Sequence, residues 1–125
     1  MEEEDFKNKR IFIVDDDAFW TKVLVKQLIA LGYHNIQTYE DGQACLDNLK
    51  YEPEVIFLDY QMEGEDGLAI LKKIKSYNEK TTVIFCTSQE DLSVALSAIH
   101  YGSLDYLLKS NMNAKELMRL FAKFE

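Results

Sequence analysis

Several short apolar runs in this sequence are followed directly by residues that could take part in chemistry. Carboxylates, hydroxyls and an ammonium stand at these places: Asp15, Asp16 and Asp17, then Asp59, then Thr87 and Ser88, and finally Lys109. A carboxylate at the end of a buried segment is costly to desolvate unless a cation or hydrogen bonds compensate for it. Crowded carboxylates with a hydroxyl and a lysine opposite them suit a divalent cation such as Mg²⁺ together with a phosphoryl group.

Asp59 is the candidate nucleophile of this set. It ends the apolar run Val55-Ile56-Phe57-Leu58, where a side chain would be held in place and still be reachable from solvent. A carboxylate placed in this way beside a metal ion can attack phosphorus and form an aspartyl phosphate. Mg²⁺ and Lys109 would neutralise the charge of the transferred group. Asp17 directly precedes a helical pattern and is predicted to be the N-cap of that helix.

The elements that would position these side chains alternate regularly along the chain. The apolar patterns predict strands over residues 11–14, 36–39, 55–58, 82–86 and 106–108. They predict helices over residues 18–31, 42–50, 66–74, 92–99 and 113–124, with Asn113 as the cap of the last one. This alternation implies a parallel sheet with helices on both faces. Ligands of such sheets bind beyond the carboxyl ends of the strands, so the candidate residues are expected to meet at one edge.

Composition limits the other classes of function. The chain has 125 residues, 47% of them hydrophobic, which suits one domain over residues 9–125 preceded by an acidic tail over residues 1–8. The net charge of −8 disfavours binding to nucleic acid and to anionic membranes. No apolar run is long enough to span a bilayer, and the acidic start is unlike a signal peptide. Cys45 and Cys86 lack metal-site spacing and are predicted to be buried thiols of a cytoplasmic protein.

The order and spacing of these pieces resemble the response-regulator receiver domain, the phosphoacceptor half of two-component signalling. The resemblance covers about Lys9 to Phe124. It rests on these segments: Ile13-Val14-Asp15-Asp16-Asp17, Phe57-Leu58-Asp59-Tyr60-Gln61-Met62, Gly64-Glu65-Asp66-Gly67, Cys86-Thr87-Ser88, and Gly102-Ser103-Leu104-Asp105-Tyr106-Leu107-Leu108-Lys109. The fold that it implies is flavodoxin-like α/β, a doubly wound parallel sheet of five strands in the order 2-1-3-4-5 with five helices.

The resemblance also implies a role for each matching residue. Asp59 would be the phosphoacceptor, Asp16 and Asp59 would ligate Mg²⁺ directly, and Asp15 would do so directly or through water. The remaining implied roles are a metal-ligating backbone carbonyl at Gln61, phosphoryl-binding backbone N–H groups at Tyr60 and Ser88, phosphoryl contacts from Thr87 and Lys109, and a switch formed by Thr87 and Tyr106.

Three positions depart from the family's usual residues. Glu63 stands where the family usually has proline, which predicts a looser loop because proline fixes φ. Ser110 follows Lys109 in place of a cis proline, so the Lys109–Ser110 bond is expected to be trans with a re-routed loop, or cis at a cost of roughly 2.5–4 kcal/mol. Ser88 stands where Ala or Gly is common, and its side chain is expected to narrow access to Asp59.

The function predicted is a phosphorylation-dependent signalling switch rather than an enzyme acting on other molecules. A sensor His kinase or a phosphotransfer protein would donate the phosphoryl group. The face formed by roughly residues 90–124 would then change output partners, whose identity the sequence does not reveal, or form a homodimer. An aspartyl-phosphate hydrolase is disfavoured because Gln61 stands where such enzymes keep a second Asp. A degenerate receiver that binds proteins independently of phosphorylation remains the alternative, because Glu63 and Ser110 depart from the pattern.

Overall fold

A central parallel sheet organises the molecule. The computed structural model describes residues 7–124. The strands of the sheet are β1 (Ile11–Val14), β2 (Ile36–Tyr39), β3 (Val55–Asp59), β6 (Thr82–Thr87) and β7 (Asp105–Leu108). They lie in the order β2-β1-β3-β6-β7, and every neighbouring pair is parallel. This is the predicted order 2-1-3-4-5, so the doubly wound flavodoxin-like fold is confirmed.

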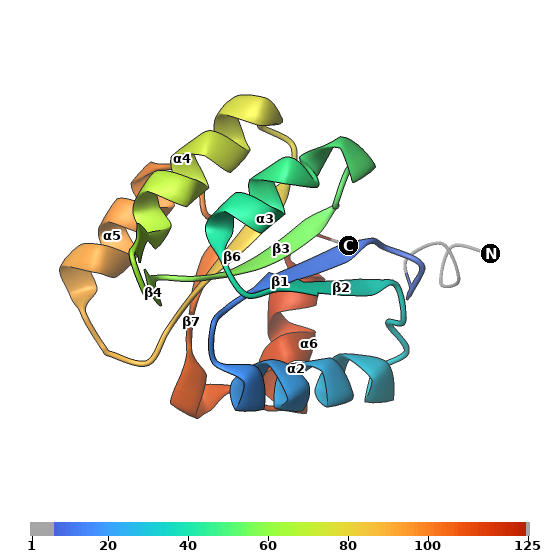
Figure 1. Ribbon diagram of the computed structural model, residues 1–125. Helices are drawn as coiled ribbons and strands as arrows, with labels where there is room; N and C mark the ends of the chain where they lie inside the picture. The colour runs from blue at the N-terminus through green and yellow to red at the C-terminus, as the bar shows by residue number, and fades with distance from the viewer. Residues whose placement is uncertain (1–6, 125) are drawn as a thin grey trace.

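Helices cover both faces of the sheet. Five α-helices lie wholly within residues 7–124: α2 (Ala18–Ala30), α3 (Gly42–Asp47), α4 (Gly67–Tyr77), α5 (Leu92–His100) and α6 (Ala114–Ala122). Figure 1 shows α2 and α6 on one face and α3, α4 and α5 on the other. The helix predicted over residues 42–50 ends earlier, and the 3₁₀ turn η1 (Leu49–Tyr51) follows it. None of the helices in this part of the chain is long and apolar enough to cross a membrane.

Two hydrophobic clusters, one on each face, fix the sheet between the helix layers. Along β1, Ile11 and Ile13 pack with the cluster under α2 and α6, whereas Phe12 and Val14 pack with the cluster under α3, α4 and α5. Successive side chains of a strand point to opposite faces, and a parallel sheet covered on both faces reads as a continuous apolar run. This is why β1, β3 and β6 are apolar at nearly every position.

Side-chain caps begin the helices close to the predicted places. The Asp17 carboxylate accepts a hydrogen bond from the Trp20 backbone N–H at 3.1 Å, and the Asn113 side chain accepts one from Glu116 N–H at 2.8 Å. Each cap satisfies a donor that the first turn of a helix leaves without a partner. The predicted N-cap roles of Asp17 and Asn113 are therefore confirmed.

A short hairpin follows β3 and was not predicted. It consists of β4 (Gln61–Met62) and β5 (Glu65–Asp66), which pair antiparallel. The turn between them is Glu63-Gly64, and Gly64 has a positive φ of 74°, which glycine adopts without steric cost. Strands of two residues are too short to show the alternation of apolar and polar residues that predicts a strand, so only their pairing in the structure reveals them.

The apolar stripe of α5 lies on the opposite side from the sheet. The helix is confirmed, but Leu92, Leu96 and Ile99 are 74%, 61% and 46% exposed. The residues that α5 packs into the core are the smaller Val94 and Ala98. A row of large apolar side chains therefore faces solvent along α5.

Several other sequence predictions can be compared with the structure. Cys45 and Cys86 are free and buried, as predicted. No peptide bond within residues 7–124 is cis, and Lys109 begins the 3₁₀ turn η2 (Lys109–Asn111), so the trans alternative for the Lys109–Ser110 bond is confirmed. Residues 1–6, most of the predicted acidic tail, lie outside the described residues. The boundary between a tail over residues 1–8 and a domain over residues 9–125 stays a prediction.

Candidate functional site

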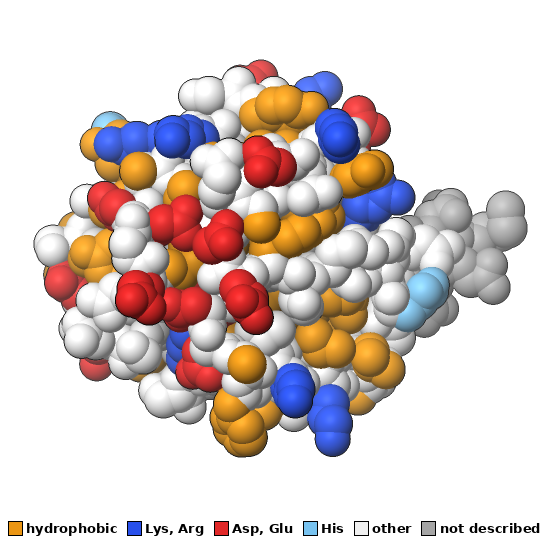
Figure 2. Space-filling model, in the orientation of Figure 1, with side chains coloured by type: hydrophobic (Ala, Val, Ile, Leu, Met, Phe, Trp, Pro, Cys, Tyr) orange, Lys and Arg blue, Asp and Glu red, His pale blue; other side chains and the backbone are white. Residues whose placement is uncertain are grey.

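The carboxyl ends of β1 and β3 bring three aspartates together. Asp15 directly follows β1, and Asp59 is the last residue of the neighbouring β3. Both carboxylates are buried, with exposed fractions of 3% and 4%, whereas Asp16 is open to solvent. Carboxylate oxygens of Asp15, Asp16 and Asp59 lie within 4.8 Å of one another. Acidic side chains gather around this region, near the β4–β5 hairpin and the starts of α2 and α3 (Figure 2).

Lys109 reaches the same place from the end of β7. Its Nζ lies 2.7 Å from Asp15 Oδ2 and 3.4 Å from Asp59 Oδ1. The Lys109 side chain is only 12% exposed, so its ammonium and the two carboxylates interact with little screening by water. One ammonium facing three carboxylates leaves the site with a surplus of negative charge.

This surplus shifts the protonation of the site. Burial, followed by repulsion from Asp15, raises the pKa of Asp59 to about 6 even though Lys109 acts in the opposite direction. Burial likewise raises the pKa of Asp15. Burial also disfavours the charged form of Lys109, but the contacts with Asp15 and Asp59 outweigh it and raise the pKa of Lys109. A further cation would relieve the repulsion among the carboxylates.

The donor set fits Mg²⁺. This ion prefers oxygen ligands, binds through a few carboxylates and keeps several of its waters. The three carboxylates of Asp15, Asp16 and Asp59 offer such oxygens within 4.8 Å of one another. The exposure of Asp16 leaves a side of the group open to water. Gln61, whose backbone carbonyl was predicted to be a further ligand, is an exposed residue of β4 two positions after Asp59.

Two of the groups predicted to donate hydrogen bonds to the phosphoryl group have other hydrogen-bond partners in this structure. Thr87 ends β6 and is buried, and its hydroxyl donates to Gln89 O at 3.3 Å and accepts from Gln89 N–H at 3.2 Å. The Tyr60 N–H donates to Cys86 O at 2.8 Å. Ser88 is exposed directly after β6. Thr87 and Tyr60 would have to exchange these partners in order to bind a phosphoryl oxygen.

The predicted switch residues meet on one loop. Tyr106 lies in β7 and is half-buried. Its hydroxyl donates to Gln89 O at 2.8 Å, which is also the acceptor of the Thr87 hydroxyl. Thr87 and Tyr106 therefore share one acceptor in the loop between β6 and α5, so a movement of that loop would affect both.

Two contacts of the site were not predicted. The Lys109 ammonium lies over the ring of Trp20, 4.9 Å from its centroid, and Trp20 was not among the residues expected at the site. The Glu63 N–H donates to Asp16 Oδ2 at 3.0 Å. Glu63 was singled out as a departure from the family, but a backbone donor has no signal in the residue type.

The sequence and the fold match those of known proteins. A family model described as the response regulator receiver domain matches residues 11–122. The chain belongs to the response regulator receiver family. Over 99 residues it is 41% identical to the DNA-binding transcriptional regulator NtrC of Klebsiella pneumoniae, a match that covers 78% of this chain and 21% of NtrC. The receiver thus spans about a fifth of the length of that relative.

Shorter relatives match this receiver along most of their length. The chemotaxis protein CheY of Bacillus subtilis is 30% identical over 101 residues, which cover 80% of this chain and 84% of CheY. The CheX–CheY–BeF₃–Mg²⁺ complex from Borrelia burgdorferi superposes with a TM-score of 0.85 at 24% identity, covering 94% of this chain and 90% of that one. The second likeness supports the shared fold.

Proposed function

We propose that this receiver is a phosphorylation-dependent signalling switch in which Asp59 is the phosphoacceptor. The observation that supports this most directly is the placement of a buried Asp59 carboxylate within 4.8 Å of two further carboxylates and 3.4 Å from the Lys109 ammonium. A nucleophile, a candidate cation site and a fixed positive charge are thus side by side, which is what phosphoryl transfer requires. The receiver is a phosphoacceptor signalling domain rather than an enzyme that turns over an external substrate.

The reaction proposed is transfer from a phosphohistidine of a sensor His kinase or phosphotransfer protein. An oxygen of Asp59 attacks phosphorus and forms a P–O bond while the P–N bond to the histidine breaks. The electron pair of the P–N bond stays on that nitrogen, and the imidazole leaves as a neutral ring because its other nitrogen already carries a proton. Lys109 moves from its pairing with Asp15 and Asp59 to a phosphoryl oxygen. The Thr87 hydroxyl and the N–H groups of Tyr60 and Ser88 donate to the other oxygens.

Mg²⁺ is the cofactor proposed for this reaction. The residues that would hold it are Asp15, Asp16 and Asp59 through their carboxylates, and Gln61 through its backbone carbonyl. When bound, Mg²⁺ supplies positive charge against the developing charge of the transferred phosphoryl group. The related receiver of Borrelia burgdorferi forms a complex with BeF₃ and Mg²⁺, which supports the same cofactor here.

The output of the switch is proposed to be the face formed by α5, β7 and α6. If the Thr87 hydroxyl leaves Gln89 O for the phosphoryl group, Gln89 O keeps only the hydrogen bond from the Tyr106 hydroxyl, and the loop that leads into α5 can move. The exposed Leu96 and Ile99 of α5 offer apolar surface to an output protein or domain, or to a second copy. The proposed setting is the cytoplasm, without direct contact to nucleic acid or membrane, in keeping with the charge of −8.

Intact mass measured after incubation with acetyl phosphate and Mg²⁺ tests the proposal. We expect a labile gain of one phosphoryl group that requires Mg²⁺ and is lost in Asp59→Asn. The absence of any gain, with Mg²⁺ binding confirmed and with a phosphorylated donor protein also tried, would refute the phosphoacceptor role. A partner that binds equally well before and after phosphorylation would favour the alternative, a receiver that acts as a phosphorylation-independent binding module.

A further inference from the structure

The tip of the β4–β5 hairpin contacts the candidate metal site through its backbone. The Glu63 N–H donates to Asp16 Oδ2 at 3.0 Å, across 47 residues of sequence. Asp15 and Asp59 are held by burial and by Lys109, whereas Asp16 is exposed and has no surrounding core to restrict its rotamer. The hydrogen bond from Glu63 is therefore the contact that orients the exposed member of the group.

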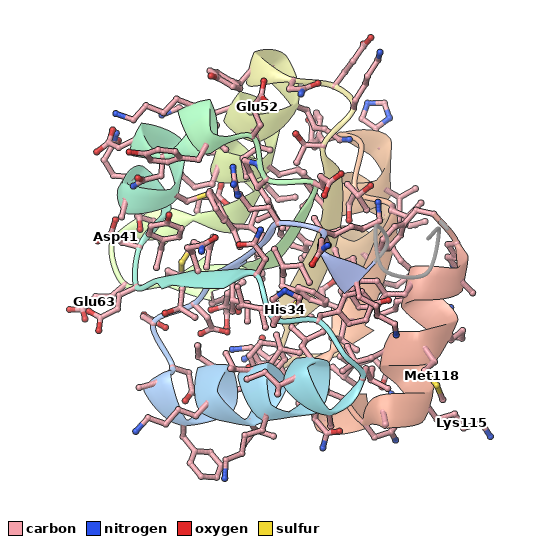
Figure 3. The ribbon with its side chains drawn as sticks, turned by 90° about the vertical axis from the view of Figure 1, so that its right-hand side faces the viewer. His34, Asp41, Glu52, Glu63, Lys115 and Met118 are labelled. Carbon is pink, nitrogen blue, oxygen red and sulfur yellow. The ribbon has the colours of Figure 1, made fainter. Side chains whose placement is uncertain are left out.

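Glu63 acts here through its N–H and not through its carboxylate. The Glu63 side chain is exposed, and Figure 3 shows it pointing away from the molecule at the tip of the hairpin. Within residues 7–124 the structure shows no ion pair or side-chain hydrogen bond of Glu63. Proline in this position would have no N–H to donate, so a receiver with the more usual proline lacks this contact.

We infer that the Glu63 N–H is a positioning group for Mg²⁺ binding at Asp16. A carboxylate can accept this hydrogen bond and still offer lone pairs to a metal. The bond restricts the rotation of Asp16, so one of its oxygens stays near the oxygens of Asp15 and Asp59, within the 4.8 Å over which the group extends. Hydrogen bonds that orient metal ligands in this way typically change metal affinity 10–100-fold when they are lost.

The turn allows this N–H to be removed with little other change. Glu63 precedes Gly64, whose φ is 74°, and proline is common directly before such a glycine in a two-residue turn. Glu63→Pro therefore deletes the donor and keeps the turn. Glu63→Ala is the matched control, because it also removes the carboxylate but retains the N–H. The comparison between these two variants isolates the hydrogen bond.

Calorimetric titration of metal-free protein with Mg²⁺ alone tests the inference. We expect Glu63→Pro to bind Mg²⁺ about tenfold more weakly than Glu63→Ala, the lower end of the range for such contacts because two other carboxylates remain. In an Asp16→Ala background, which removes the acceptor, the difference between Pro and Ala is expected to disappear. Thermal unfolding of the metal-free variants checks that both are folded, and amide exchange of Glu63 in the unmodified protein is expected to be slowed.

Three results would overturn the inference. The first is equal Mg²⁺ affinities of folded Glu63→Pro and Glu63→Ala. The second is a difference between them that persists in the Asp16→Ala background. The third is unprotected exchange of the Glu63 amide, which needs no variant. The choice of Mg²⁺ rests on the proposed function, but none of these measurements involves a phosphoryl donor. A receiver that binds Mg²⁺ as expected and fails to accept a phosphoryl group would refute only the proposed function.

Discussion

Replacing Asp59 with asparagine removes a buried charge and keeps the shape of the side chain. The pKa of Asp59 is raised from 3.8 to about 6, first by burial and then by the charge of Asp15. The folded state therefore holds the proton of Asp59 more tightly than the unfolded state does. Its contribution to stability is complete below about pH 4 and is lost as the pH rises through about 6. Above that range the ionised carboxylate destabilises the metal-free protein.

The size of the effect follows from the pKa difference. A rise from 3.8 to about 6, at about 1.4 kcal/mol for each pKa unit, corresponds to ~3 kcal/mol. Asparagine does not titrate, so Asp59→Asn should raise the free energy of unfolding by ~3 kcal/mol at pH 8. Near pH 4 the two proteins should be almost equally stable, because protonated aspartate and asparagine are both neutral and similar in size.

Urea unfolding in the presence of EDTA at pH 4, 6 and 8 measures this difference. Asp47→Asn is the control, because Asp47 is exposed and its carboxylate accepts a hydrogen bond from the Gln43 side chain at 2.8 Å. We expect this control to change the free energy of unfolding by no more than about 0.5 kcal/mol. Saturating Mg²⁺ should stabilise the unmodified protein more than it stabilises Asp59→Asn. The difference between their free energies of unfolding should therefore become smaller. The reasoning would be refuted if Asp59→Asn raised the free energy of unfolding equally at pH 4 and pH 8, or lowered it at pH 8.

Two further substitutions test contacts of the site and of α5. Trp20→Leu removes the ring beneath the Lys109 ammonium and should slow phosphorylation by acetyl phosphate about threefold or more. Phe19→Leu is the control, because the Phe19 side chain is 78% exposed, and it should leave the rate unchanged. Equal rates of phosphorylation in the two variants would contradict this prediction. Leu96→Ala should change the free energy of unfolding by about 0.5 kcal/mol or less. Leu71 lies in α4 and is fully buried, so Leu71→Ala should lower the free energy of unfolding by about 2–5 kcal/mol. If urea unfolding showed equal decreases in the free energy of unfolding for Leu96→Ala and Leu71→Ala, Leu96 would have to face the core.

Much of the site could be predicted because parallel strands carry their chemistry at one end. Once β1, β3 and β7 are recognised as apolar runs, the residues that follow them must share an edge of the sheet. This placed Asp15, Asp59 and Lys109 together before any distance was known. The residue types then indicated the chemistry, since a hard cation and a phosphoryl group are what carboxylates and an ammonium can bind.

The orientation of α5 could not be predicted from its residues. Leu96 and Ile99 are larger and more apolar than Val94 and Ala98, and a helix usually buries its most apolar stripe. In the structure the smaller pair is buried and the larger pair is exposed. Which stripe faces the sheet depends on the space that the neighbouring elements leave, and that space exists only once the chain has folded.

The sequence by itself determined the alternation of strands and helices and the edge of the sheet that carries the site, because these follow from local apolar patterns and from the ends of parallel strands. The strand order came from the resemblance to the receiver family. Only the tertiary structure decided how the residues of the site are held. The raised pKa of Asp59 follows from burial, which is a property of the whole fold. The hydrogen bond from Glu63 to Asp16 joins a backbone donor to a distant side chain, and every residue except proline carries such a donor. No residue type could have indicated it.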